Sequence, residues 1–110
     1  MSGRNCIETF KRDNQLVDII FQHKGKENAI GTKELACALN ERGYSVSPDI
    51  IHGIVKKVIF ERHLPICAVV HCGYYWGTSK QDIQFAIDEL QEKIYGLQER
   101  IDLLKSFICE

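Results

Sequence analysis

The last third of the sequence carries an unbroken apolar pattern that only a long helix can use. Isoleucine or leucine recurs at alternating intervals of four and three residues, at Ile83, Ile87, Leu90, Ile94, Leu97, Ile101, Leu104 and Ile108. This heptad pattern places all eight side chains along one side of an α-helix. A helix over residues 80–108 would be about 43 Å long, which overhangs a domain of this size. We therefore expect these eight residues to form the dimerisation surface of a homodimer.

The residues beside this apolar stripe leave the arrangement of the two helices open. Isoleucine at one heptad position and leucine at the other favours a parallel two-stranded coiled coil. The flanking positions hold Lys93, Arg100 and Lys105, so no attractive charge pair reinforces a parallel register. Further apolar side chains lie off the stripe, namely Phe85, Tyr95, Leu103 and Phe107. They leave the alternative that the helix packs within its own chain and forms no dimer.

Length and composition indicate one small domain. With 110 residues, of which 45% are hydrophobic and 26% charged, the chain is typical of a soluble globular protein. We expect residues 1–78 to form a head and residues 79–110 a dimerisation helix within the same structural unit. Residues 1–79 carry 10 lysines and arginines against 8 acidic residues, whereas residues 80–110 carry 4 against 7. The two parts need not face the same partner.

Targeting signals and cysteine usage point to a reducing compartment. No apolar run reaches the ~18 residues that a membrane span needs, and the first residues lack the apolar core of a secretory signal. The five cysteines are an odd number, which cannot all pair within one chain. We expect a cytoplasmic protein, or one in the host cytoplasm if a virus encodes it, with no membrane partner.

The first half of the chain contains two amphipathic segments and a short strand. Leu16, Val17, Ile20 and Phe21 predict a helix from residue 13 or 14, which the spacing of Cys6, Ile7 and Phe10 could extend backwards. Ala29 and Ile30 indicate a stub of strand. Thr32 is the expected N-cap of the next helix, whose buried face is Leu35, Ala36 and Leu39, and Gly43 suits its left-handed C-terminal end.

The second half begins with the sharpest local signal, a serine cap followed by proline. Ser47 and Pro48 predict the start of a helix with a wide apolar stripe that ends before Pro65. Residues 66–70 and 74–76 then predict a β-hairpin. Ser79, with Asp82 three residues later, caps the last helix. The fold class is therefore mainly α with a small β-hairpin, a winged helix-turn-helix plus a long C-terminal coiled-coil-like helix.

Residues 30–76 resemble a known family in four short stretches. These are Ile30-Gly31-Thr32-Lys33-Glu34-Leu35, Val46-Ser47, Pro65-Ile66-Cys67 and Gly73-Tyr74-Tyr75. They are similar to the winged-helix domains of phage and prophage regulators and replication proteins. The resemblance implies a DNA-binding protein, a transcriptional regulator of a phage or mobile element, with double-stranded DNA as its partner.

Seven residues are candidates for contacting DNA. In the winged-helix interpretation, the helix from Pro48 enters the major groove, and its first turn faces base edges. Ser47 and the free N–H groups of that turn suit a phosphate oxygen, while Lys56 and Lys57 would reach phosphates. His71 would stand at the tip of the hairpin, with Arg62 just before it. The full set is Ser47, Asp49, His52, Lys56, Lys57, Arg62 and His71.

The main alternative is a protein-interaction or inhibitor module built on a winged-helix fold without DNA binding. The near-neutral net charge of −1 and the acidic C-terminal segment favour it. No catalytic motif is recognisable, so we expect no enzyme, no cofactor and no small-molecule substrate. His63, Cys67, His71 and Cys72 match no common zinc-binding spacing, and we expect no metal site.

Overall fold

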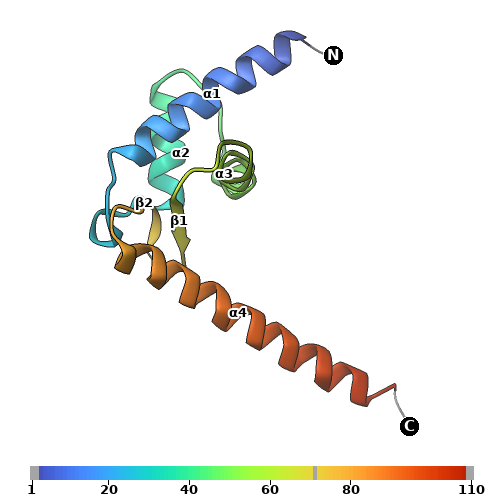
Figure 1. Cartoon of the computed structure of the whole chain (residues 1–110). Helices are drawn as coiled ribbons and strands as arrows, with labels where there is room; N and C mark the ends of the chain where they lie inside the picture. Colours follow the sequence, from blue (N-terminus) through green and yellow to red (C-terminus); the bar gives the residue numbers. More distant parts are fainter. Residues whose placement is uncertain (1–2, 71, 109–110) are drawn as a thin grey trace.

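The computed structural model describes residues 3–70 and 72–108, with side chains from residue 7 onward. In chain order the elements are α1 (Gly3–Phe21), the 3-10 turn η1 (Lys26–Asn28), α2 (Thr32–Glu41), α3 (Pro48–Arg62), β1 (Ile66–Val69), β2 (Gly73–Trp76) and α4 (Lys80–Ser106). The predicted class of a mainly helical chain with one antiparallel hairpin and a long C-terminal helix is confirmed (Figure 1).

The core of the head forms where α1, α2 and α3 pack together. Each helix contributes apolar side chains at intervals of three and four residues, which places them on one face. The fully buried members of this set are Leu16, Ile20, Leu35, Leu39, Ile51, Val55 and Val58. The helical segments expected from periodicity are therefore confirmed, and α1 extends back to Gly3.

The hairpin is joined to the segment that precedes α2. β1 and β2 pair antiparallel from Ile66 opposite Trp76 to Val69 opposite Gly73. Ile30 and Tyr74 exchange two backbone hydrogen bonds of 2.8 Å, so the expected strand stub is a single antiparallel bridge. Gly73 has a φ of 107°, and a Cβ there would collide with the backbone oxygen of Ile30. Glycine is therefore required where the hairpin meets the head.

Two of the expected helix caps differ from those in the structure, one in its position and one in its hydrogen bonding. Thr32 is the first residue of α2 and Gly31 is the N-cap, so the prediction of Thr32 as the cap was wrong by one residue. Ser47 does hold the N-cap position of α3, but its side chain makes no capping hydrogen bond. At α4 the Ser79 hydroxyl accepts a hydrogen bond of 3.1 Å from the Asp82 amide, as predicted. Gly43 has the expected positive φ, 96°.

α4 packs on the head only near its start and then runs away from it (Figure 1). Ala86 is buried against β1 and β2, where it meets Cys67, Val69 and Tyr75. The Tyr75 hydroxyl donates a hydrogen bond of 2.8 Å to the Asp82 carbonyl oxygen, which fixes the first turn. The overall dimensions of 56 × 38 × 23 Å reflect the protruding helix. Within residues 3–70 and 72–108, no helix has the length and apolar character needed to cross a membrane.

Candidate nucleic-acid and subunit interfaces

The start of α3 presents four of the predicted DNA-contacting residues to solvent. Ser47 stands at the N-cap, and Asp49, His52 and Lys56 follow at intervals of three and four residues on the exposed side of the helix. The Ser47 hydroxyl makes no capping bond, so it is free to bind a ligand oxygen. The backbone N–H groups of the first turn add a partial positive charge, which Asp49 opposes.

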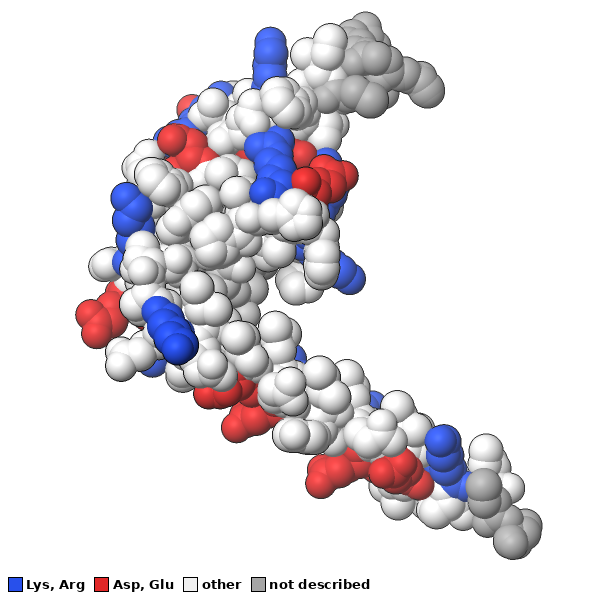
Figure 2. Space-filling model, in the orientation of Figure 1, with Lys and Arg blue, Asp and Glu red and all other residues white. Residues whose placement is uncertain are grey.

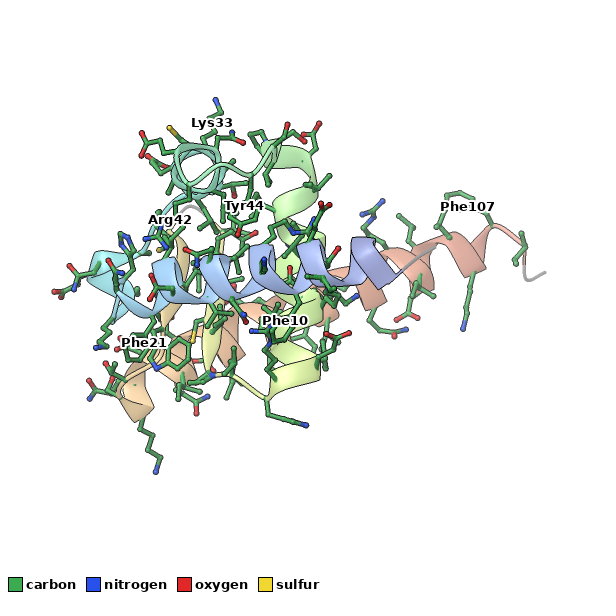
Figure 3. All side chains as sticks on the ribbon, turned by 90° about the horizontal axis from the view of Figure 1, so that it is seen from above. Phe10, Phe21, Lys33, Arg42, Tyr44 and Phe107 are labelled. Atoms are coloured by element: carbon green, nitrogen blue, oxygen red, sulfur yellow. The ribbon has the colours of Figure 1, made fainter. Side chains whose placement is uncertain are left out.

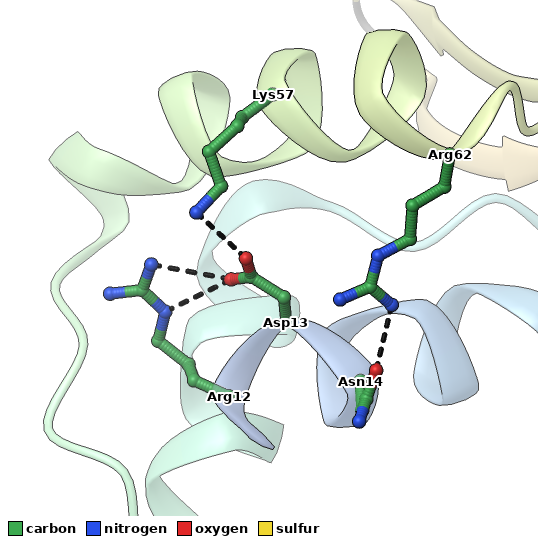
Figure 4. A network of polar contacts seen from close by, with 5 residues as sticks. All are labelled: Arg12, Asp13, Asn14, Lys57 and Arg62. Carbon is green, nitrogen blue, oxygen red and sulfur yellow. Dashed lines mark hydrogen bonds and ion pairs between the residues drawn. The ribbon is translucent and has the colours of Figure 1, made fainter. Parts of the chain in front are cut away.

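Lys57 and Arg62 instead turn toward α1 (Figure 4). The Lys57 ammonium lies 2.8 Å from a carboxylate oxygen of Asp13. Arg62 donates a hydrogen bond of 2.7 Å to the Asn14 side-chain oxygen, and its guanidinium lies 5.1 Å from the centre of the Phe10 ring. The structure thus separates these two cations from the other predicted contacts on α3.

Asp13 explains why Lys57 is held in this position. The Asp13 residue is only 3% exposed, and a buried carboxylate needs cationic or hydrogen-bonding partners. Arg12 supplies two hydrogen bonds of 3.3 Å to one oxygen, and Lys57 binds the other oxygen. Reaching a phosphate would require Lys57 to leave this carboxylate. The sequence contains one hint of this role, because Asp13 falls in register with the apolar positions Leu16 and Ile20.

A cleft at the hairpin collects residues from four elements. It has a volume of about 360 Å³ and is lined by Thr32 of α2, His52 of α3, Gly73 of the hairpin and Lys93 of α4. Sequence reasoning did not associate Lys93 with His52, because no local pattern links positions 41 residues apart. The predicted contact His71 lies outside the described residues.

A larger, mainly apolar groove separates α3 from the first half of α4. Its volume is about 500 Å³. α3 contributes Ile59 and Phe60, β1 contributes Ile66, and α4 contributes Ile87 and Leu90. In Figure 2 this groove is the hollow between the head and α4, and its surface is mostly free of charged side chains. His52 and Lys56 also line it, so the exposed side of α3 faces this hollow as well as solvent.

The eight predicted dimerisation residues form one exposed stripe. Seven of them lie on α4, and Ile108 lies just beyond its last residue, Ser106. Their exposed fractions run from 38% at Ile83 to 79% at Ile108. Ala86 is the single buried residue of α4. Acidic side chains gather on the side of α4 that faces away from the head (Figure 2). From these exposed fractions, the stripe is an apolar face that the described part of its own chain leaves uncovered.

Burial favours the neutral form of three ionisable groups in the hairpin strands, Cys67, Tyr74 and Tyr75. Burial raises the pKa of the Tyr75 hydroxyl well above its usual value, and the neighbouring Cys67 thiol raises it further. Burial likewise raises the pKa of Cys67 and of Tyr74. A thiol must ionise to act as a nucleophile, so Cys67 is a packing residue here. Among the described residues, no three His, Cys, Asp or Glu side chains gather as a metal-binding group.

Comparison with known proteins yields no relative for this chain. No protein-family model, curated protein or solved structure matches it.

Proposed function

We propose that this chain is a winged helix-turn-helix protein that binds double-stranded DNA as a homodimer and regulates transcription. The supporting observation is the arrangement of α2, a short turn, α3 and the hairpin, with Ile30 bridged to Tyr74. In a helix-turn-helix the second helix enters the major groove with its N-terminal residues toward the bases. α3 holds that position in the chain and presents its first turn to solvent.

Within this proposal, four side chains of α3 contact DNA directly. Ser47 and the first-turn N–H groups bind a phosphate oxygen, and Lys56 contacts the backbone. Asp49 accepts a hydrogen bond from a cytosine amine, the donor that acidic side chains recognise in the major groove. His52 and Lys93 line the same cleft at the hairpin, and both contact the DNA backbone there. Lys57 and Arg62 act indirectly by fixing α3 against α1.

Dimerisation is part of the proposal because the exposed side of α3 offers one lysine, Lys56, while Lys57 and Arg62 bind residues of α1. Phosphate contacts supply most of the affinity of a DNA-binding protein, and each contact steepens its dependence on salt. Two heads double these contacts and define two half-sites at a set spacing. The apolar stripe on α4 provides the means of association.

The test is a titration of random duplex DNA at several salt concentrations, followed by fluorescence anisotropy. We expect binding that weakens as salt rises. Lys56→Glu should weaken it at every salt concentration when compared with the wild type at equal extents of dimerisation, because Lys56 also lines the groove. Lys11→Glu, which changes an exposed lysine of α1, is the matched control and should bind like the wild type. Lys57 is unsuited to this test because its replacement would also disturb Asp13. No salt-dependent binding to any duplex would contradict the proposal.

A second candidate function is a protein-interaction module. Phe60 on α3 is 70% exposed beside the apolar groove, a position that suits a protein surface better than a phosphate. This function predicts a stoichiometric complex with a host protein that survives high salt and is lost in Phe60→Asp. Tight DNA binding without such a complex would reject it.

A further inference from the structure

The apolar stripe of α4 continues without interruption from the groove to the end of the helix. Its first members, Ile83, Ile87 and Leu90, line the groove, and the later ones extend past the head. The exposed apolar surface of the eight residues equals that of about four complete side chains in each copy. Monomeric proteins rarely leave so much contiguous apolar surface uncovered. A single occupant must therefore fit both the free stripe and the groove.

We propose that two copies pair through α4 in antiparallel orientation, so that the C-terminal half of each α4 fills the groove of the other copy. This rests on the homodimer proposed above and adds its orientation and its second contact surface. The occupant of the groove is thus a segment of this same chain, residues 97–108.

The stripe is self-complementary in the antiparallel orientation. A two-fold axis between residues 95 and 96 places every isoleucine of one helix opposite a leucine of the other, or opposite the terminal isoleucine. Antiparallel coiled-coil layers join the two heptad positions in this way. The resulting layers use all eight residues and leave no overhang: Ile83 with Ile108, Ile87 with Leu104, Leu90 with Ile101, and Ile94 with Leu97.

The side chains along one flank of α4 favour the antiparallel orientation. Ala86, Lys93, Arg100 and Phe107 follow one another at intervals of seven, so they share one flank of α4. The helix packs on its own hairpin by this flank, through Ala86. In an antiparallel pair the same flanks of the two helices face each other. Phe107 of one copy then lies level with Ala86 of the other, at the end of the groove that Ile83 and Ala86 line.

A parallel pair would leave the apolar side chains of Leu103 and Phe107 without packing partners. Phe107 lies at the far end of α4, away from the head (Figure 3), and Leu103 lies one turn earlier. With both helices pointing the same way, these side chains would face solvent, and they are 71% and 60% exposed in the single chain. The antiparallel pair instead carries them to Ile59 and Phe60 on α3 of the other copy.

Charge does not favour either orientation, because each brings one kind of cation pair together, twice in a symmetric dimer. Arg100 meets Lys105 in the parallel pair, and Lys93 meets Arg100 in the antiparallel pair. The groove and the off-stripe apolar residues are therefore the features that favour the antiparallel orientation. Both orientations predict that added salt strengthens the dimer by screening this repulsion.

The antiparallel pair has a geometric consequence for DNA binding. Both heads contact α4 through the same flank, so both lie on one face of the helix pair. Their contact points, centred on Ala86, are separated along the helix by about 30 Å, from a rise of 1.5 Å per residue. Half-sites one helical turn apart on DNA are separated by about 34–36 Å. Of the four proposed DNA contacts on α3, His52 and Lys56 line the groove and border the partner helix on that side, whereas Ser47 and Asp49 lie outside the groove.

The first test asks whether α3 takes part in dimerisation. Phe60→Asp should raise the dimer dissociation constant by about tenfold or more, because Phe60 lines the occupied groove. Ile50→Asp changes another exposed apolar residue of α3 that does not line the groove, and should change the constant by less than about twofold. Sedimentation equilibrium measures the constant, and circular dichroism checks that both variants fold. Equal constants for Phe60→Asp and the wild type would contradict the proposal.

The second test determines the orientation directly. Phe107 is replaced by the photo-cross-linker p-benzoylphenylalanine, and the variant is mixed with ¹⁵N-labelled wild type before irradiation. We expect intermolecular cross-links to α3 or to residues 83–90, located by mass spectrometry. Cross-links confined to the C-terminal half of the labelled copy would show a parallel pair and overturn the proposal, as would a protein that stays monomeric. The same replacement at Tyr95, which lies off the stripe, should give no cross-link to α3.

These results are separable from the DNA proposal. Head-directed cross-links in a protein that binds no duplex would support the antiparallel pair and overturn DNA binding. DNA binding by a monomer or by a parallel dimer would do the reverse. Salt provides a further distinction, since it should tighten the dimer and loosen the DNA complex.

Discussion

The head and the distal half of α4 use the same apolar residue types but differ in what covers them. In the head, Leu16, Leu35 and Leu39 are fully buried by neighbouring helices of the same chain. In the distal half of α4, Leu97 and Leu104 are 55% and 63% exposed, although their spacing is as regular. The head thus has a hydrophobic core closed within one chain, whereas the distal helix leaves its apolar face exposed.

This difference indicates where stability and function reside. A core closed within one chain stabilises the head at any concentration. An isolated helix has little stability of its own in water and depends on packing of its apolar face. In the proposed dimer, the distal half of α4 therefore gains most of its stability from association with the other copy.

The largest expected effect on stability comes from truncating one leucine in each region. Leu39→Ala should lower the free energy of unfolding by about 2–5 kcal/mol at every protein concentration, because it opens a cavity in the closed core. Leu97→Ala should lower it only where the protein is dimeric. Urea unfolding over a range of concentrations measures both. An equal loss for Leu97→Ala in dilute monomer would break the comparison.

The next effect concerns pH and the buried hairpin. Because the pKa of Tyr75 is raised above its usual value of 10.0, the folded protein holds its proton more tightly than the unfolded chain does. This contribution to stability is fully present below about pH 10 and is lost as the pH rises toward the folded pKa. Unfolding measured from pH 8 to 11 should show the decline.

Tyr75→Phe is the control for this prediction. It removes the ionising group together with its hydrogen bond to Asp82, so the variant should be less stable at pH 8 but decline less at high pH. A decline parallel to that of the wild type would assign the pH effect to other groups.

The buried carboxylate of the head gives a smaller effect. Asp13→Ala should cost about 2–3 kcal/mol of unfolding free energy, because the Asp13 carboxylate binds both Arg12 and Lys57. Asp18→Ala removes an exposed pair with Arg42 and should cost no more than about 1 kcal/mol. Thermal or urea unfolding compares the two variants. Equal losses would mean that burial at Asp13 does not strengthen its pairing.

The smallest effect compares the two serine caps. Ser79→Ala should cost about 1 kcal/mol because it removes a hydrogen bond to the first turn of α4. Ser47→Ala should cost only a few tenths of that, because the Ser47 side chain makes no capping bond. If Ser47→Ala weakens DNA binding while leaving stability unchanged, the Ser47 hydroxyl contacts DNA rather than stabilising α3. An equal stability loss at both caps would contradict this division.

Much of the fold follows from local patterns, while the candidate sites follow from them only in part. The apolar spacing of Leu35 and Leu39, the Ser47-Pro48 start and the hairpin residues predict the elements found. The same patterns missed the binding of Lys57 to Asp13 and the presence of Lys93 and His52 in the lining of one cleft. Both pairs join distant parts of the chain, and periodicity carries information only about neighbours on one element.

The sequence by itself determined that residues 83–108 would present a continuous apolar stripe, because heptad spacing and helix geometry suffice to align the side chains. Only the tertiary structure decided that the stripe begins inside a groove. That groove exists because Tyr75 and Ala86 anchor α4 to the hairpin at an angle that leaves Phe60 facing Leu90 across a gap. The direction in which one element leaves another is set by packing between distant residues, which no local spacing encodes.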